Sequence, residues 1–252
     1  MKTTIKIFPS PNELAENFAE DLVKMIIESA ERRKTFTVAL SGGSTPGLLF
    51  SVLGERFSDS VPWKFVHLFW GDERCVPPDD PESNFGMTKK VFLEKIKIPP
   101  ANIHRIIGEK DPSEEALRYS NEIAGFTSEM AGLPVFNLII LGLGEDGHTA
   151  SIFPDNNKLL NSEKICEVAI HPLSFQKRIT ITGKVINNAE NVVFLVTGEN
   201  KAEVVSAIIE RPGTVDFPAA RIDPKTGLLK WYLDDAAAKM IDKKNLIDFQ
   251  CK

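Results

Sequence analysis

The chain has 252 residues, 42% of them hydrophobic and 26% charged, and its net charge is −5 at pH 7. Such a composition can bury a sizeable core, its negative charge offers no general attraction to nucleic acid, and no apolar run is long enough to span a bilayer. The three cysteines (Cys75, Cys166 and Cys251) are too few and too far apart for a zinc motif or a disulfide framework, so we expect no metal. From the charge and the lack of a long apolar run we expect no nucleic-acid partner and no membrane partner.

Strand-like and helix-like segments alternate along the chain. We expect strands at residues 4–8, 36–40, 64–70, 103–107, 136–141, 165–170, 178–182, 192–197 and 228–233. We expect helices within residues 11–33, 46–56, 82–95, 112–131, 183–189, 201–209 and 235–243. This alternation predicts an α/β fold, a single three-layer Rossmann-like domain over residues 1–252 with a mainly parallel sheet flanked by helices. The amino terminus lacks the apolar segment of a signal peptide, so we expect a cytoplasmic protein.

The first polar loop follows the apolar run 36–40 and reads Ser41-Gly-Gly-Ser-Thr-Pro46. Pro46 suits the first turn of a helix, and Ser44 or Thr45 can cap it. Glycines, hydroxyls and a helix amino terminus together predict a phosphate cradle, although a merely well-capped turn explains the pattern too. The sequence is not a Walker loop, because no Gly-Lys-Ser/Thr follows the glycines.

Charged residues follow two more strand candidates. Residues 64–70 lead into Gly71-Asp-Glu-Arg74, and residues 192–197 lead into Gly198-Glu-Asn-Lys201. A solvated surface loop at 72–74 and an exposed helix face at Lys201 are the alternatives. Cys75 is also a candidate nucleophile, but no histidine pairs with it in the sequence.

A glycine-rich loop at residues 141–154, Leu-Gly-Leu-Gly-Glu-Asp-Gly-His-Thr-Ala-Ser-Ile-Phe-Pro, follows the apolar run 136–141. It places His148 after three glycines, where a helix is able to begin, and this position suits a general base. The glycines also fit a dinucleotide fingerprint, but no acidic residue closes the next strand, so we expect no nicotinamide cofactor. A histidine without a role is the remaining alternative.

In a parallel sheet these four loops emerge at the carboxyl edge, where ligands bind. A histidine, carboxylates, an arginine, a lysine and an anion-binding turn would then share one rim. The sequence therefore predicts a site for a small phosphorylated molecule.

These motifs resemble the bacterial-type 6-phosphogluconolactonases, which share a superfamily with the glucosamine-6-phosphate isomerases. The resemblance rests on residues 41–46, 70–74 with 76–79 and 82–85, 141–154, 178–182, 197–201 and 231–237, and so covers almost the whole chain. The isomerases carry Asp-Glu-Tyr where this chain has Asp72-Glu-Arg74, and His-Ile-Ala-Phe-Asn-Glu where it has His148-Thr-Ala-Ser-Ile-Phe153. Both differences favour the lactonase.

The resemblance implies hydrolysis of 6-phospho-D-glucono-1,5-lactone to 6-phospho-D-gluconate in the oxidative pentose phosphate pathway, without a cofactor. Its catalytic residues would be His148, Arg74, Asp72 and Asp146, with Glu145 as an alternative partner for the histidine. It places the phosphate at Ser41, Gly42, Gly43, Ser44 and Thr45, with Arg178 and Lys201. We expect a monomer or a small homo-oligomer.

Two alternative functions remain open. One is glucosamine-6-phosphate deamination, which releases ammonia. The other is a phosphosugar-sensing module, but such modules accompany a DNA-binding domain, and we expect none before the strand at residues 4–8.

Overall fold

The computed structural model describes residues 3–211, 213–242 and 249–251. Its strands are β1 (Thr3–Phe8), β2 (Phe36–Leu40), β3 (Val66–Trp70), β4 (Asp72–Arg74), β5 (Ile103–His104), β6 (Ser128–Met130), β7 (Leu133–Val135), β8 (Leu138–Leu141), β9 (Cys166–Ile170), β10 (Lys177–Ile181), β11 (Asn191–Val196), β12 (Leu228–Asp234) and β13 (Phe249–Cys251). Its α-helices are α1 (Pro11–Glu31), α2 (Ser44–Arg56), α3 (Asn84–Val91), α4 (Pro112–Phe126), α5 (Gly183–Ile186) and α6 (Ala202–Glu210). Short 3₁₀ segments lie at Trp63–Phe65, Leu93–Lys95, Pro100–Asn102, Pro154–Leu160, Glu199–Lys201 and Pro218–Arg221.

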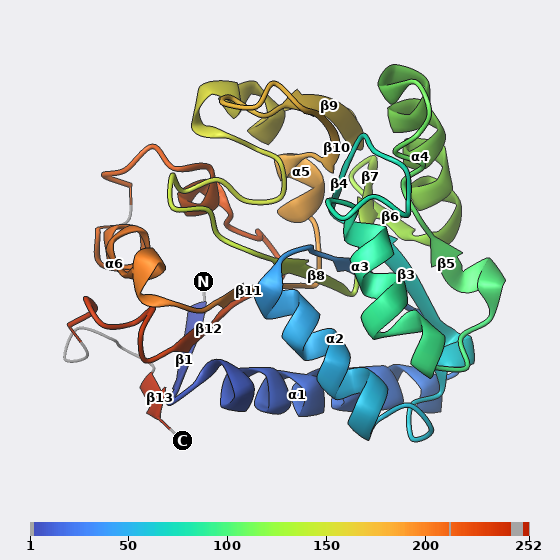
Figure 1. Cartoon of the computed structure of the whole chain (residues 1–252), viewed down its shortest axis with the longest axis horizontal. Coiled ribbons are helices and arrows are strands. Elements are labelled where there is room, and N and C mark those ends of the chain that lie inside the picture. Colours follow the sequence, from blue (N-terminus) through green and yellow to red (C-terminus); the bar gives the residue numbers. More distant parts are fainter. Residues whose placement is uncertain (1–2, 212, 243–248, 252) are drawn as a thin grey trace.

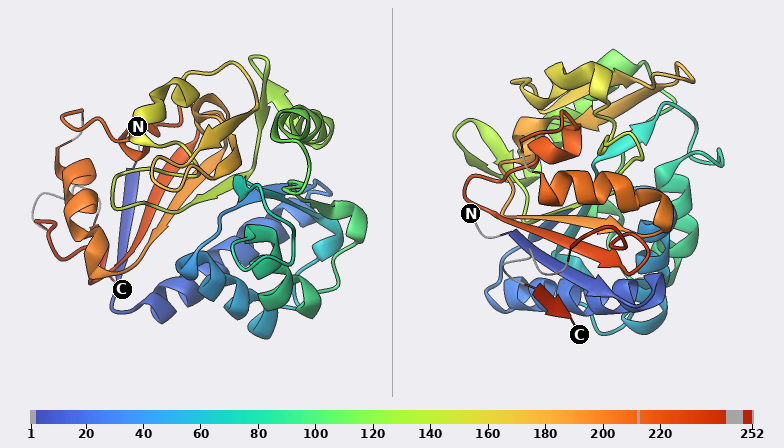
Figure 2. Two further views of the ribbon diagram at one scale, coloured as in Figure 1. Left: turned by 45° about the horizontal axis from the view of Figure 1, so that its top comes forward. Right: turned by 90° about the vertical axis from the view of Figure 1, so that its left-hand side faces the viewer.

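A parallel sheet forms the centre of the molecule. Within the described residues it has eight strands in the order β13-β1-β12-β11-β8-β2-β3-β5, and all its pairings are parallel. Helices α1 and α2 cover one face, whereas α5, α6 and a smaller sheet lie over the other (Figures 1 and 2). The predicted three-layer α/β fold with a mainly parallel sheet is confirmed.

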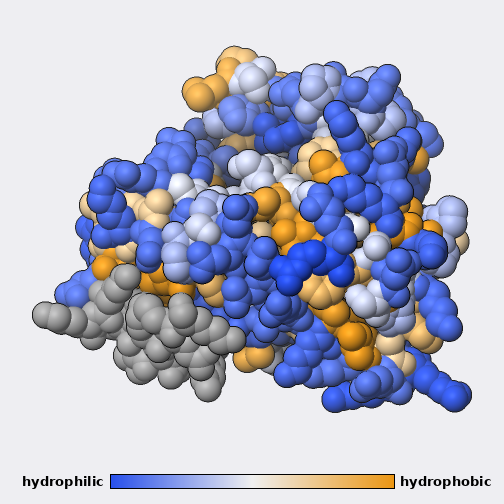
Figure 3. Space-filling model, turned by 60° about the horizontal axis from the view of Figure 1, so that its bottom comes forward, coloured by the Kyte–Doolittle hydropathy of each residue, from blue (hydrophilic) through white to orange (hydrophobic). Residues whose placement is uncertain are grey.

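Helix α1, at the bottom of Figure 1, is amphipathic. In α1, Leu14, Phe18, Leu22 and Ile26 recur at four-residue intervals and are almost completely buried. The helix begins after Ser10, whose hydroxyl accepts a hydrogen bond from the backbone N–H of Glu13. Seen from the side on which α1 lies, the surface is mainly hydrophilic, with apolar residues in small groups (Figure 3).

The second sheet is small and antiparallel, in the order β4-β10-β9. Gly71 joins it to the main sheet, because its N–H donates to Leu40 O at 2.8 Å and its carbonyl accepts from Ile181 N at 2.8 Å. Only this residue separates β4 from the end of β3. The short connection brings Asp72 directly to the carboxyl edge of the main sheet.

Two predicted helices differ from the structure. The helix expected over residues 112–131 ends at Phe126, because Ala131 and Gly132 adopt φ values of 55° and 78° and form the tight turn of the β6–β7 hairpin. Residues 235–242 form turns and bends rather than the expected helix. At the start of this segment Asp235 N–H donates to Phe8 O, which extends the pairing of β12 with β1. Residue 243 of that prediction lies outside the described residues.

The remaining boundaries shift by smaller amounts. The strand expected at 103–107 is only two residues long, and α2 begins two residues before the predicted position. The apolar residues of the described chain form one continuous core. The single-domain organisation over residues 1–252 stays a prediction.

The order of the central strands determines where a ligand can bind. From β2 the chain continues to β3 and β5 on one side, whereas β8, β11 and β12 lie on the other. The loops after β2 and β8 therefore diverge at the carboxyl edge, and such a switch point is the usual ligand crevice of an open α/β sheet.

Candidate active site

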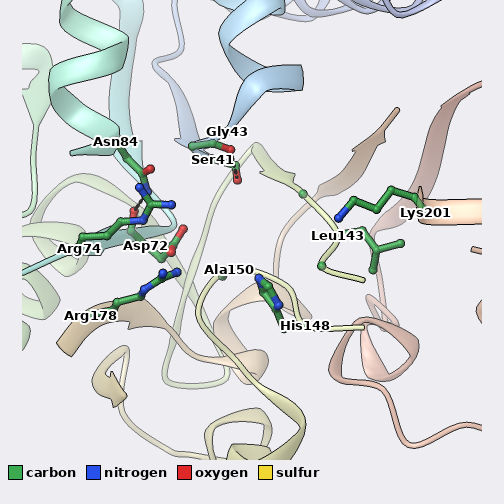
Figure 4. A pocket seen from close by; sticks show the side chains of 13 residues that line it. Ser41, Gly43, Asp72, Arg74, Asn84, Leu143, His148, Ala150, Arg178 and Lys201 are labelled. Atoms are coloured by element: carbon green, nitrogen blue, oxygen red, sulfur yellow. Dashed lines mark hydrogen bonds between the residues drawn. The ribbon is translucent and has the colours of Figure 1, made fainter. Parts of the chain in front are cut away.

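A cavity of about 220 Å³ lies at this switch point (Figure 4). The predicted convergence of four loops is confirmed, because residues following β2, β3, β8 and β11 all line the cavity. The lining residues are Ser41, Gly42, Gly43, Asp72, Arg74, Asn84, Gly142, Leu143, Gly144, His148, Ala150, Arg178 and Lys201.

Three predicted site residues do not line the cavity themselves. Asp146 contacts His148, and the Thr45 hydroxyl lies 2.7 Å from the Thr197 hydroxyl, which ties the start of α2 to the end of β11. Ser44 is the first residue of α2, directly after Gly43.

The loop after β8 holds His148 in a tight turn. Gly144 N–H donates to His148 O at 2.8 Å, and Gly147 has a φ of 80°, which favours glycine. An isolated bridge between Thr149 and Ile152 follows, and no helix begins at His148, contrary to the prediction. Without a helix behind the glycines, the loop does not match the dinucleotide fingerprint.

The imidazole of His148 is held by Asp146. Nδ1 lies 2.5 Å from Asp146 Oδ1, which also accepts the His148 N–H at 3.1 Å. A carboxylate at Nδ1 favours the tautomer with its proton there, so Nε2 is left as the proton acceptor. Burial alone would raise the pKa of Asp146, but the charge of His148 and its two hydrogen bonds outweigh burial and lower that pKa. Asp146 therefore stays ionised and supports a charged imidazole.

Asp72 and Arg74 project from β4, which pairs with β10. The register places Arg178 opposite Arg74 and Thr180 opposite Asp72. Asp72 is 6% exposed, and its Oδ2 accepts a hydrogen bond of 2.6 Å from the buried Ser151 hydroxyl. The carboxylate is thus fixed in orientation at the cavity wall.

Two guanidinium groups lie side by side at this wall (Figure 4). Arg74 Nη1 donates to the Glu82 carbonyl, but the Nε atoms of Arg74 and Arg178 are buried without a hydrogen-bond partner in the described chain. Burial lowers the pKa of Arg178, Asp72 opposes that shift and Arg74 adds to it. This corner of the cavity is therefore suited to an anionic or strongly polar group.

Glu73 faces away from the cavity and serves the fold. Its carboxylate is 2% exposed and accepts the N–H groups of Arg74, Asn84 and Phe85 at 2.7–2.8 Å, together with the Ser83 hydroxyl. Burial raises the pKa of Glu73 despite these donors. The carboxylate ties β4 to the start of α3, so residues 72–74 are not the solvated surface loop considered as an alternative.

Asn84 reaches the cavity because the Glu73 carboxylate holds the start of α3 against β4. Its Nδ2 donates to Asp72 O at 2.9 Å, and its amide fills the space where a side chain on Gly42 would lie. A glycine is required at position 42 for this approach. Residues 82–85 belong to a motif in the sequence, but the motif does not by itself predict a role for Asn84. The local signal is Ser83, which caps α3 and places Asn84 in its first turn.

The loop after β2 forms the opposite wall. Gly43, with a φ of 102°, is the N-cap of α2, and no side chain caps this helix. The expected capping by Ser44 or Thr45 is therefore wrong. The Gly43 carbonyl accepts the first helical hydrogen bond, from Gly47 N, and the N–H groups of the first turn are left uncapped beside the cavity. An open helix amino terminus attracts anions through its free amides and its dipole.

Lys201 enters from the far side of the cavity, with His148 between it and Arg178 (Figure 4). Its Nζ lies 4.0 Å from Glu145 Oε1, which also accepts from Asn200 Nδ2 at 2.6 Å. The buried Asp234 carboxylate accepts the Gly198 and Ala237 N–H groups and so fixes the loop that carries Lys201. Glu145 therefore pairs with this loop rather than with His148.

The described residues do not support a cysteine nucleophile or a metal site. Burial, reinforced by Glu73, raises the pKa of Cys75 to about 11, which argues against its role as a nucleophile. No cluster of three or more histidine, cysteine or carboxylate side chains suited to a metal ion occurs in residues 3–211, 213–242 and 249–251. No helix in the same residues is long and apolar enough to cross a membrane.

Comparison with known proteins identifies the family. The sequence model described as glucosamine-6-phosphate isomerases/6-phosphogluconolactonase matches residues 9–231. The chain belongs to this family. The resemblance found in the sequence motifs is confirmed.

Relatives in this family cover nearly the whole chain. The 6-phosphogluconolactonase of Haemophilus influenzae is 40% identical over 238 residues, which are 93% of this chain and 98% of that protein. The 6-phosphogluconolactonase of Synechocystis is 40% identical over 217 residues, 85% of this chain and 88% of that protein. The solved structure of the Trypanosoma brucei 6-phosphogluconolactonase superimposes with a TM-score of 0.85 at 28% identity and covers 94% of this chain and 98% of its own.

Proposed function

We propose that this protein hydrolyses 6-phospho-D-glucono-1,5-lactone to 6-phospho-D-gluconate. The observation that carries the proposal is the Asp146–His148 pair, held at 2.5 Å at the edge of a cavity with cationic groups on two sides. Relatives that match nearly the full chain carry the name of this activity. The proposal includes a cytoplasmic enzyme of the oxidative pentose phosphate pathway, a monomer or small homo-oligomer without a cofactor or a nucleic-acid partner.

In this mechanism His148 acts first as a base and then as an acid. Nε2 takes a proton from water while the water oxygen bonds to the lactone carbonyl carbon. The tetrahedral intermediate collapses as the bond from that carbon to the ring oxygen breaks, and the imidazolium returns the proton to that oxygen. Asp146 stabilises the imidazolium in between. The acid that forms ionises at neutral pH, so each turnover releases one proton.

The other site residues divide between the two ends of the substrate. Arg74 stabilises the negative carbonyl oxygen of the intermediate, and Asp72 orients Arg74 or binds the sugar hydroxyls. The phosphate binds at residues 41–45, where the open amino terminus of α2 supplies amides, with Arg178 and Lys201 as its cationic partners.

Proton release tests the proposal directly. Freshly generated 6-phosphogluconolactone is added to the enzyme, and the rate is corrected for spontaneous hydrolysis. Enzyme-dependent proton release supports the lactonase. Ammonia release from glucosamine 6-phosphate without lactone hydrolysis would identify a deaminase, and phosphosugar binding without turnover would identify a sensing module.

A further inference from the structure

Phe153 lies behind the reacting groups of the cavity. It is 1% exposed, and its ring contacts three polar side chains: His148, His171 and Arg178. Two of these belong to the proposed catalytic and phosphate-binding sets, and they come from different elements of the fold. One buried ring therefore connects the loop after β8 to strand β10.

The contact with His148 fixes the plane of the imidazole. The two ring centroids are 4.8 Å apart, with 49° between the planes, within the range of favourable aromatic pairs. The hydrogen bond from Nδ1 to Asp146 holds one edge of the imidazole, but a single bond leaves rotation about its own axis possible. The tilted Phe153 ring packed against the imidazole restricts that rotation, so the two contacts together determine where Nε2 points.

The contact with Arg178 stabilises a partly buried guanidinium group. The guanidinium carbon lies 5.6 Å from the centre of the Phe153 ring, a cation–π distance. Arg178 has a buried Nε without a hydrogen-bond partner in the described chain, and Arg74 lies opposite it in the register. The aromatic face compensates part of the lost hydration and keeps the guanidinium in place.

His171 is the third neighbour of the Phe153 ring. His171 meets Phe153 edge to face at 5.0 Å, and its Nδ1 accepts the N–H groups of Leu173 and Ser174 at 3.2 Å. These bonds stiffen the turn between β9 and β10. Phe153 is thereby enclosed between a fixed turn and the two functional side chains.

We propose that Phe153 is a positioning residue that sets the plane of the His148 imidazole and the place of the Arg178 guanidinium through contacts of both with one buried ring. The inference rests on the proposed lactonase function. It assigns to one side chain an effect on both turnover and phosphate affinity, whereas ordinary core packing would affect the stability of the fold alone.

Phe153→Leu tests this assignment, with Phe92→Leu as the matched control. Phe92 is also 1% exposed and lies in an aromatic cluster with Phe50 and Trp63, outside the cavity lining. Both variants lose a similar buried ring, so thermal melting should report similar destabilisation. Phe153→Met, whose unbranched and flexible side chain adapts to the space of the ring at a volume similar to that of leucine, replaces the leucine variant if that variant fails to fold.

The effect of Phe153 on turnover and its effect on phosphate affinity are measured separately. We expect Phe153→Leu to lower kcat roughly tenfold to a hundredfold on both 6-phosphogluconolactone and unphosphorylated gluconolactone, because the base is displaced. KM should rise about threefold or more for the phosphorylated substrate only, because Arg178 loses its aromatic partner. Phe92→Leu should leave kcat and KM near the wild-type values.

Unchanged kcat and KM in folded Phe153→Leu would overturn the inference, as would equal losses in both variants. An inactive wild type marks failure of the proposed function instead. In that case calorimetric titration with inorganic phosphate decides the Arg178 half: weaker binding to Phe153→Leu than to Phe92→Leu supports the inference, and equal binding overturns it.

Discussion

Replacement of Gly144 by alanine offers a sharp test of the proposed base. Gly144 is not among the glycines with a left-handed backbone, so alanine introduces no strain of that kind. The added Cβ would lie 2.5 Å from Asp146 Oδ1 and closer still to Nδ1 and Cε1 of His148. These atoms are ends of partly exposed side chains, which can move without unfolding the loop.

The size of the expected decrease in kcat follows from the overlap of the added Cβ with His148 and Asp146. Carbon contacts are comfortable from about 3.5 Å, so the imidazole and the carboxylate must each withdraw by roughly 1 Å. A displacement of that size at a reacting group costs about a hundredfold in kcat, or about 2.7 kcal/mol on the barrier. The Gly144 N–H bond to His148 O can persist, so the protein should stay folded.

The assay is corrected proton release from 6-phosphogluconolactone, with melting temperature as the control for folding. Gly125→Ala is the matched substitution, because a Cβ there meets no atom within 4 Å and the site lies in α4, outside the cavity lining. Gly144→Ala should have no further effect once His148 is replaced by alanine, since both changes remove the same base. Near-normal kcat in Gly144→Ala, or full additivity with His148→Ala, would refute the reasoning.

Four other results are expected. His148→Ala should lower kcat by roughly two to four orders of magnitude while 6-phosphogluconate still binds in a calorimetric titration, because the base acts in the transition state; near-normal kcat would exclude the role. Arg178→Ala and Lys201→Ala should chiefly raise KM for the phosphorylated lactone, and equal losses on unphosphorylated gluconolactone would argue for a structural or catalytic role instead. Activity should survive dialysis against a strong chelator and need no nicotinamide; a loss restored only by added zinc or another divalent ion would contradict the proposed water activation by a side chain. Burial lowers the pKa of His67 and, despite Glu122, that of His104, so the unfolded chain binds more protons than the folded one just below the ordinary histidine range. The melting temperature should therefore fall as the pH is lowered from about 7 to about 5, and His67→Gln should reduce that fall; an unchanged pH dependence in the variant would count against this origin.

The sequence by itself determined the α/β class and the loops that carry the site. Apolar strand candidates followed by polar loops predict side chains at the carboxyl edge of a parallel sheet, since the direction of each strand decides where its loop emerges. This is why the sequence is sufficient to predict that residues 41–43, Asp72, Arg74 and His148 share one rim, and all of them line one cavity. The family, too, was recognisable from the order of these motifs.

Only the tertiary structure decided how these side chains are oriented and supported. Glu73 is adjacent to two cavity residues in the sequence, yet the alternation of β4 turns it into the interior, where it binds the start of α3. Asn84 and Phe153 owe their places beside Gly42 and His148 to contacts between segments brought together by folding or by a tight turn. Local patterns predict elements and their ends, but the partner of a buried carboxylate or ring depends on packing between segments distant along the chain, and this packing is visible only in three dimensions.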